Sequence, residues 1–279
     1  MERARQITQD TYILPSSLVV PGLGIIPVNA FVVKAADPVL VDCGLHPDRT
    51  EFLSALEEII DPSDLRWIYL THPDADHTGS LHALVEAFPG VRVITTFVGM
   101  GMLSLRDPLP PDRVYLLNPG ERLDLGDRSL VCLRPPTFDN PATTAVYDIR
   151  SHALFSSDAF GAVVQSPAEE AFSIPREDLR AGQLLWSSVD APWLQSVDRS
   201  KFAATLNRIQ DLDPDLVLSA HLPPARAMLP QLLETLFEAP DQPEFMGPNQ
   251  AALSVMLREM TGSAPIEPKP IPTNGGVHP

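Results

Sequence analysis

Within six positions the sequence carries two histidines and two aspartates, in the stretch Thr71-His72-Pro73-Asp74-Ala75-Asp76-His77-Thr78-Gly79-Ser80. The apolar run 67–70 before it predicts a buried strand, and the pattern over residues 81–88 predicts a helix. The polar stretch is therefore expected on a loop at the carboxyl end of a strand. Open α/β sheets place their ligands at such ends.

The simplest alternative for this loop is a turn with helix caps, in which Asp76 or Thr78 caps the following helix. Capping explains one aspartate, but not two carboxylates and two imidazoles at one strand end. Buried like charges repel each other unless a cation neutralises them. Imidazole and carboxylate together suit divalent transition metals, so the stretch favours a metal site.

The composition describes an acidic globular protein of 279 residues, 44% of them hydrophobic, with a formal charge of -16. Nucleic acid is an unfavourable partner for this charge, because it binds cationic surfaces. No apolar run approaches the roughly 20 residues of a membrane span, and the charged residues 1–6 do not resemble a secretory signal. The two cysteines, Cys43 and Cys132, form no disulfide framework. We therefore expect a cytoplasmic protein.

The predicted elements begin with strands and continue as alternating strands and helices. Strands are expected at residues 12–14, 18–20, 28–33, 39–41, 67–70, 91–94, 114–117, 130–133, 145–148, 152–156 and 216–218. Helices are expected near residues 47–60, 81–88, 202–209, 227–237 and 250–260. This order predicts an α/β sandwich of two mixed β-sheets with helices outside.

Three segments of the chain carry less regular patterns. Residues 97–113 are ambiguous, and residues 162–200 form a proline-punctuated insertion that we expect to be partly helical and close to the site. We expect a metal-binding domain over residues 1–240, followed by a C-terminal helix and a tail over residues 241–279. From Thr261 to Pro279 the tail is rich in Pro and Gly, which predicts extended or disordered chain.

Three further residues, Asp139, Asp158 and His221, join the list of candidate ligands. Asp158 and His221 each follow a predicted strand closely, and Asp139 lies in a turn-rich segment. Singly, an Asp or His in such a place is more often a turn residue or a hydrogen-bonded structural group. Together with the 72–77 cluster they indicate one shared metal centre.

These segments resemble the metallo-β-lactamase superfamily, and within it the flavodiiron and oxygen-binding di-iron branch. Hydrolytic members of that superfamily carry His-x-His-x-Asp-His, whereas the di-iron branch carries His-x-Glu-x-Asp-His. This chain has an acid, Asp74, at the third position of the motif. Residues 154–161 are similar to the branch's segment with the bridging aspartate, and Ser219-Ala220-His221 is similar to the segment with the last histidine ligand.

The resemblance implies a four-layer αββα sandwich and a binuclear centre. One metal would take His72, Asp74 and Asp139, the other Asp76, His77 and His221, and Asp158 would bridge them. Asp139 departs from the family, in which a histidine stands at that position. Asp42, in Val41-Asp42-Cys43-Gly44, matches an early turn of the family that supports the ligands without binding metal.

Several other residues are better explained by structural roles. We interpret His82 as a surface or supporting group and Cys43 as a small core residue. His46, His152 and His278 have no ligand-like neighbours. Aromatic side chains of and near the insertion are more often packing residues than substrate contacts: Phe160, Phe172, Trp186 and Trp193. Tyr147 is a candidate hydrogen-bond donor to the ligands.

The oxygen-rich ligand set favours two iron ions, with Mn or Zn as alternatives. Three functions follow. The first is a di-iron oxidoreductase that acts on O2, peroxide or NO, or uses O2 to oxidise a small substrate. The second is a binuclear hydrolase of an ester, thioester, lactone or phosphodiester. The third is an oxygen-binding or sensor protein without turnover.

For the first function the sequence suggests no catalytic acid or base beyond the metal ligands. No flavin is implied, because no flavodoxin-like segment follows in the sequence. Electrons would then come from a redox partner protein or from the substrate itself. We expect a small molecule or O2 as substrate and neither nucleic acid nor membrane as partner, and we leave a homodimer open.

Overall fold

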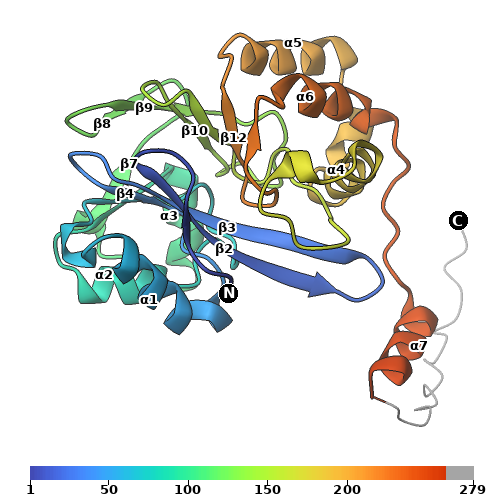
Figure 1. Cartoon of the computed structure of the whole chain (residues 1–279), viewed down its shortest axis with the longest axis horizontal. Helices are drawn as coiled ribbons and strands as arrows, with labels where there is room; N and C mark the ends of the chain where they lie inside the picture. Colours follow the sequence, from blue (N-terminus) through green and yellow to red (C-terminus); the bar gives the residue numbers. More distant parts are fainter. Residues whose placement is uncertain (262–279) are drawn as a thin grey trace, which may run out of the picture. The chain divides into compact units, whose positions relative to one another are not determined.

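The computed structural model describes residues 1–261 (Figure 1). Residues Met1–Phe245 form one compact unit, and a second unit begins at Met246 and contains the helix α7 (Gln250–Thr261). The tail predicted over Thr261–Pro279 lies, after Thr261, outside the described residues. None of the helices within residues 1–261 is long and apolar enough to cross a membrane.

The first sheet contains seven strands whose spatial order is their sequence order. They are β1 (Arg5–Gln6), β2 (Thr11–Val20), β3 (Gly24–Val33), β4 (Val39–Val41), β5 (Trp67–Tyr69), β6 (Arg92–Thr95) and β7 (Val114–Leu116). Strands β1 to β4 pair antiparallel, and β4 to β7 pair parallel. The carboxyl ends of β4 and β5 therefore lie side by side at one edge of the sheet.

The second sheet contains six strands in the order β13-β12-β11-β10-β9-β8. They are β8 (Arg122–Asp124), β9 (Ser129–Leu133), β10 (Ala145–Asp148), β11 (Ala153–Phe155), β12 (Leu216–Leu218) and β13 (Ala225–Arg226). Only β11 and β12 pair parallel; the other pairs are antiparallel. Both sheets are therefore mixed, as the sequence predicts.

Six helices of the first unit lie in two groups (Figure 1). The first group is α1 (Arg49–Ile59), α2 (Leu81–Ala87) and α3 (Phe97–Ser104), and the second is α4 (Arg176–Asp190), α5 (Arg199–Gln210) and α6 (Leu229–Glu238). Short 3₁₀ turns connect some elements, at His46–Asp48, Pro62–Asp64, Pro111–Arg113, Ala171–Ser173, Pro192–Ser196 and Ala239–Asp241.

Three hydrophobic clusters show how the layers stack. One joins residues of both sheets, including Phe31 and Phe155, whose rings meet edge to face at 5.5 Å. A second joins the first sheet to the first helix group, with Phe52 of α1 packed in it. A third joins the second sheet to α4, α5 and α6. Burial of these apolar faces drives folding. The order in which the sheets and helices pack confirms the four-layer αββα sandwich.

Strand β2 differs from the prediction, which placed two strands at residues 12–14 and 18–20. It is one strand through Pro15, which pairs with Asn29 of β3. Asn29 sends its backbone N–H to Ala220 instead of to Pro15. The missing N–H of Pro15 therefore faces away from β3, toward the segment before the short strand β1, where Glu2 N–H donates to the Pro15 carbonyl. Proline is tolerated at such an edge position.

Other differences concern short or ambiguous elements. The ambiguous residues 97–113 contain α3 and a 3₁₀ turn, and the insertion 162–200 contains α4 between two 3₁₀ turns. Strands β8 and β13 have three and two residues and were not predicted. Strands β7 and β9 flank the turn at 118–120 but belong to different sheets.

Candidate metal centre

Six of the candidate ligands, and Asp42, which supports them, come from loops at the carboxyl ends of four strands, whereas Asp139 lies in the loop between β9 and β10. The 72–77 loop follows β5 and Asp42 follows β4, in the first sheet. Asp158 follows β11 and His221 follows β12, in the second sheet. Because β4 and β5 run parallel, as do β11 and β12, each pair of loops meets at one sheet edge. The sandwich brings the two edges together.

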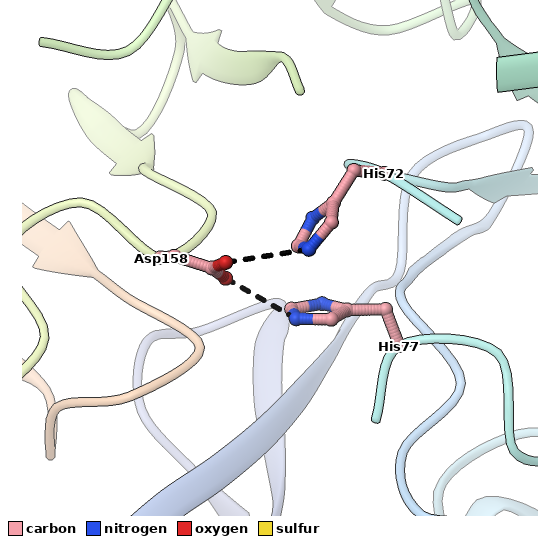
Figure 2. Close-up of side chains that lie close together, drawn as sticks. All are labelled: His72, His77 and Asp158. Carbon is pink, nitrogen blue, oxygen red and sulfur yellow. Dashed lines mark ion pairs between the residues drawn. The ribbon is translucent and has the colours of Figure 1, made fainter. Parts of the chain in front are cut away.

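The carboxylate of Asp158 stands at the middle of the centre. Its Oδ1 lies 3.1 Å from Nε2 of His77 and 3.2 Å from Nε2 of His221. Its Oδ2 lies 3.3 Å from Nε2 of His72. Figure 2 shows the two oxygens directed at His72 and His77 respectively. The two oxygens of one buried carboxylate thus face two different sets of donors.

Two further aspartates extend these sets on either side. Oδ2 of Asp76 lies 3.5 Å from Nε2 of both His77 and His221. Oδ2 of Asp74 lies 4.0 Å from Nε2 of His72. The donor atoms of Asp76, His77 and His221 lie within 4.8 Å of one another, as do those of His72, Asp74 and Asp139. All seven residues predicted from the sequence are therefore gathered here.

Asp139 differs from the other six in its exposure to solvent. Its Oδ1 accepts hydrogen bonds from Thr143 Oγ1 at 3.1 Å and from Asn140 Nδ2 at 3.0 Å. It also faces Asp74, whose pKa is raised by burial and by the neighbouring carboxylate. Two carboxyl groups this close repel each other unless they share a proton or a cation.

Hydrogen bonds to the far ring nitrogens orient the three imidazoles. His221 donates from Nδ1 to the carbonyl of Pro27 at 2.7 Å, which leaves Nε2 as an acceptor. Nδ1 of His77 lies 2.9 Å from Oδ2 of Asp42. Nδ1 of His72 lies 3.2 Å from the hydroxyl of Ser157. Partners of this kind fix the tautomer and the ring orientation of metal-binding histidines.

Asp42 is itself held by the loop that it supports. It has a positive φ of 61° and accepts hydrogen bonds of 2.8 Å from both the backbone N–H and the hydroxyl of Thr71. Non-glycine residues take this conformation rarely, and it is concentrated at functional sites. Gly79 completes the packing, because a Cβ there would lie 2.2 Å from the carbonyl carbon of Leu45.

Two buried polar atoms of the centre indicate that these side chains suit a bound cation. Nε2 of His77 and Oδ1 of Asp158 are fully buried and lie 3.1 Å apart, but neither has a hydrogen bond of good geometry to a residue in the described range. A buried polar atom without a partner is costly. Divalent ions between these atoms would satisfy them, and carboxylate with imidazole is a set that iron, manganese and zinc accept.

Neighbouring charges shift the pKa values of the buried aspartate and histidine of the centre. Burial alone would raise the pKa of Asp158, but His72, His77 and His221 hold that pKa well below its usual range. Burial alone would lower the pKa of His77, but the carboxylates of Asp158 and Asp42 raise it well above its usual range. Because a histidine binds metal in its neutral form, bound cations and protons compete for this site.

Trp186 of α4 covers one side of the centre. Its Nε1 donates to the carbonyl of Asp158 at 3.0 Å, and its ring lies 4.4 Å from the ring of His221. Gly161 makes room for it, because a Cβ there would lie 2.5 Å from Nε1 of Trp186. The sequence favoured a packing role for this tryptophan, whereas the structure places it directly against a candidate ligand.

Three other aromatic residues considered from the sequence lie elsewhere. Trp193 donates from Nε1 to the carbonyl of Phe138 at 2.7 Å, beside the loop that carries Asp139. Phe160 is buried in the core around the second sheet, and Phe172 is 69% exposed.

Two roles that the sequence analysis considered are not found in the structure. Tyr147 does not reach the ligands: its hydroxyl donates to the carbonyl of Leu212 and contacts His152. Neither Asp76 nor Thr78 caps α2, which begins after Ser80 without a side-chain cap.

Asp190, the last residue of α4, is a neighbour that the sequence analysis missed. Its Oδ2 is fully buried and has no hydrogen-bond partner among the described residues. Burial and the carboxylates of Asp158 and Asp139 raise its pKa to about 8, although His221 and His77 oppose the shift. No local pattern identifies it, because an aspartate at a helix end is common.

Replacement of Asp190 by Asn is expected to stabilise the metal-free protein at alkaline pH. The ordinary pKa of this group is 3.8, so between pH 4 and about 8 the folded protein holds a proton that the unfolded chain has lost. The free energy of unfolding therefore falls as pH rises through that window. The variant avoids this loss, and its advantage should reach about 2 kcal/mol or more by pH 8.

Thermal unfolding of both metal-free proteins between pH 4 and pH 9 measures this effect. The two curves should converge near pH 4, where both side chains are neutral. A stability difference that does not depend on pH would contradict the raised pKa.

Residues 26–221 match the family described as "ODP family beta lactamase". The chain belongs to this family. The match begins within β3 and ends at His221, so it contains all seven candidate ligands.

Curated relatives of this ODP-family chain include flavodiiron proteins. It is 28% identical over 134 residues to the anaerobic nitric oxide reductase flavorubredoxin of Salmonella typhi. The matched segment covers 48% of this chain and 28% of the relative. It is also 25% identical over 193 residues to an uncharacterized protein of Methanocaldococcus jannaschii. That matched segment covers 69% of this chain and 48% of the relative. The chain thus spans less than half the length of these relatives.

Among solved structures, rubredoxin oxygen:oxidoreductase from Desulfovibrio gigas matches with a TM-score of 0.74 at 20% identity. The match covers 86% of this chain and 61% of that one. At this identity the likeness shows the fold alone, and it agrees with the αββα layers described above. The expected resemblance to the flavodiiron branch of the metallo-β-lactamase fold is confirmed.

Proposed function

We propose that this ODP-family chain is a binuclear non-haem iron protein that acts as an oxidoreductase on O2, peroxide or NO, or uses O2 to oxidise a small substrate. The observation that carries the proposal is the carboxylate of Asp158, whose two oxygens face two separate groups of donors. A single metal ion would not require both oxygens of one buried aspartate to be directed at different histidines.

The residues that would hold the metals fall into the two groups described above. His72, Asp74 and Asp139 would hold one ion, and Asp76, His77 and His221 the other, with Asp158 shared between them. Bound iron would supply the capacity to bind and reduce small oxidants. Four carboxylates among seven ligands favour iron over zinc, because anionic oxygen donors stabilise the higher charge of an oxidised metal.

The protein's own residues position and shield the ligands. Asp42, Ser157 and the carbonyl of Pro27 fix the orientations of the three imidazoles. The indole of Trp186 packs on His221 and limits the approach of water from the side of α4. Asp139 is exposed and marks a part of the centre that solvent reaches, and we propose that the substrate enters there.

The relatives support the class of reaction. By name they are a nitric oxide reductase and a rubredoxin oxygen:oxidoreductase, and each is a longer protein than this one. For this chain we propose electrons from a partner protein or from the substrate.

Metal content of the protein, purified without added metal, tests the proposal together with an absorption spectrum. We expect about two irons per chain and an absorption band in the near ultraviolet or visible when the protein is oxidised. With a chemical reductant, the same sample should consume O2 or NO. About two zincs and no colour would contradict the proposal and indicate a hydrolase. Two irons without turnover would indicate an oxygen-binding or sensor protein.

Replacement of Asp139 by Ala is expected to weaken one of the two metals selectively. Asp139 belongs only to the group with His72 and Asp74, so the other group keeps its donors. Affinity for one equivalent should fall about 10- to 100-fold. Titration of the metal-free protein with Fe(II) under anaerobic conditions measures both equivalents. Asp112→Ala, at another exposed aspartate, is the control; equal binding in the two variants would exclude Asp139 as a ligand.

A further inference from the structure

A cavity of about 500 Å³ lies beside the loop that carries Asp139. Its walls come from the end of β9 and the residues after it, from the turn before α5, and from one face of α5. The lining residues are Leu133, Arg134, Pro135, Pro136, Phe138, Trp193, Val197, Lys201, Phe202, Thr205, Arg208, Ile209, Asp211 and Leu212. The volume falls in the range of small-molecule sites.

The lining is largely apolar. The rings of Phe138 and Trp193 pack together with centroids 5.2 Å apart, and Phe202 and Ile209 present buried apolar side chains from α5. Such a surface is suited to the hydrocarbon part of a ligand, because apolar burial supplies most of the binding free energy at small-molecule sites.

Three cations, Arg134, Lys201 and Arg208, line the same cavity, against one carboxylate, Asp211. This concentration is unusual in a chain whose formal charge is -16. None of the three forms an ion pair with another residue in the part of the chain that the structure describes. A cationic cavity in an acidic protein selects anions from solution, because its local field opposes that of the rest of the surface.

Arg134 connects the cavity to the Asp139 loop. Its Nη1 donates to the carbonyl of Pro141 at 3.0 Å and also to that of Thr143, and its guanidinium lies 5.3 Å from the ring centre of Phe138. These contacts fix its position without neutralising its charge. Lys201 and Arg208 project from exposed positions of α5 and carry the charge that is free to meet a ligand.

We propose that this cavity binds a small organic anion with an apolar body, of the aryl or alkyl carboxylate class. The aromatic and aliphatic lining takes the hydrocarbon part, and Lys201 and Arg208 pair with the carboxylate. Asp211 at the same cavity disfavours ligands with several negative charges. The site is separate from the metal centre, with which it shares only the Asp139 loop.

Calorimetric titration of the full chain with 1-naphthoate and with octanoate tests the proposal. The neutral analogue of the first probe is 1-naphthamide. We expect one molecule of either carboxylate per chain, with affinity at least about tenfold greater for 1-naphthoate than for the amide, and weaker binding at high salt. Equal affinity for acid and amide, or no saturable binding, would overturn the proposal.

Two variants locate the site. Lys201→Gln combined with Arg208→Gln should weaken 1-naphthoate binding at least about tenfold and leave amide binding unchanged. Arg176→Gln is the matched control, because Arg176 lies on α4, outside the cavity, in an exposed pair with Glu234. Carboxylate binding that survives the double substitution would overturn the assignment.

Asp158→Asn separates this site from the metal centre. If 1-naphthoate binds as proposed, its affinity is unchanged by that substitution. Loss of binding in Asp158→Asn, with no effect of the double substitution on α5, would place the anion at the metals and overturn the proposal. Failure of the metal proposal would leave all of these expectations in place.

Discussion

Asp158→Asn is expected to abolish binding of both metals and to reduce O2 or NO consumption by more than about 100-fold. Asp158 places one oxygen 3.1 Å from Nε2 of His77 and the other 3.3 Å from Nε2 of His72. An amide keeps the shape of the carboxylate but removes its charge, and its nitrogen offers a donor where the metal needs an acceptor. Both groups of ligands lose a shared anion at once.

Metal analysis and activity with a chemical reductant measure the effect. Asp178→Asn, at an exposed position near the start of α4, is the control and should resemble the unmodified protein. The contrast with Asp139→Ala is informative, because Asp139 serves one group and Asp158 serves both. If Asp158→Asn retains two metals, the shared position of this carboxylate would have no role in binding.

The metal-free Asp158→Asn protein should still fold. Asp158 is fully buried among histidines, and without a cation its charge is balanced only by their protonation. The substitution removes a buried charge, so circular dichroism and thermal unfolding of the metal-free variant should show a folded protein. This measurement separates lost metal binding from lost structure.

Arg128→Met is expected to destabilise the protein by about 3 to 5 kcal/mol. Arg128 is nearly inaccessible, and its Nη1 donates to Oδ2 of Asp148 at 3.1 Å. Its Nη2 pairs with Asp10 and Asp127. Asp148 has no exposed surface, and the substitution would leave its carboxylate buried without a cation. The cost arises from that uncompensated charge more than from the lost pair itself.

Thermal unfolding is the measurement, and a decrease of about 10 °C in Tm is expected for a unit of this size. Arg176→Met is the matched control, because its pair with Glu234 is well exposed on both sides and should contribute less than about 1 kcal/mol. Adding Asp148→Asn to Arg128→Met should recover part of the loss. A change in Tm no larger than that of Arg176→Met would show that the buried pair contributes little.

Asp158 and Asp148 lie at opposite ends of the second sheet. Asp158 follows the end of β11, and Asp148 ends the antiparallel neighbour β10. Antiparallel strands end at opposite edges of a sheet, so the buried Arg128 network supports the edge away from the metal centre. Thr144 N–H, at the start of β10, donates to the carbonyl of Thr71 and joins β10 to the candidate metal loop.

Much of the fold was predictable from local pattern. Apolar runs ended by polar clusters identified β4, β5, β11 and β12, and the order of elements indicated a sandwich of mixed sheets. The same pattern brought the candidate residues to strand ends, since the polar side chains came directly after the apolar runs. The predicted break between two strands at Pro15 was wrong, because a proline interrupts a strand only where its missing N–H faces a partner strand.

In the candidate site, ligands that are neighbours in the sequence were predictable, whereas contacts between the two sheets were not. His72, Asp74, Asp76 and His77 are close in the sequence, and a loop of six residues keeps them close in space. The directions in which the two oxygens of Asp158 point were not predictable in this way. They depend on the distance at which the edges of two sheets meet, which no local pattern encodes.

The sandwich, the strand ends that carry polar side chains and the kind of ligands there could be predicted from the amino-acid sequence, because they follow from periodicity and residue type. The three-dimensional packing was needed to show that Trp186 covers His221 and that Asp190 lies near other carboxylates. It was also needed to show that Lys201 and Arg208 share a cavity with Phe138. Each of these relations joins residues distant in the chain. Such contacts arise from how helices pack on sheets, and the residues involved carry no periodic signal of their own.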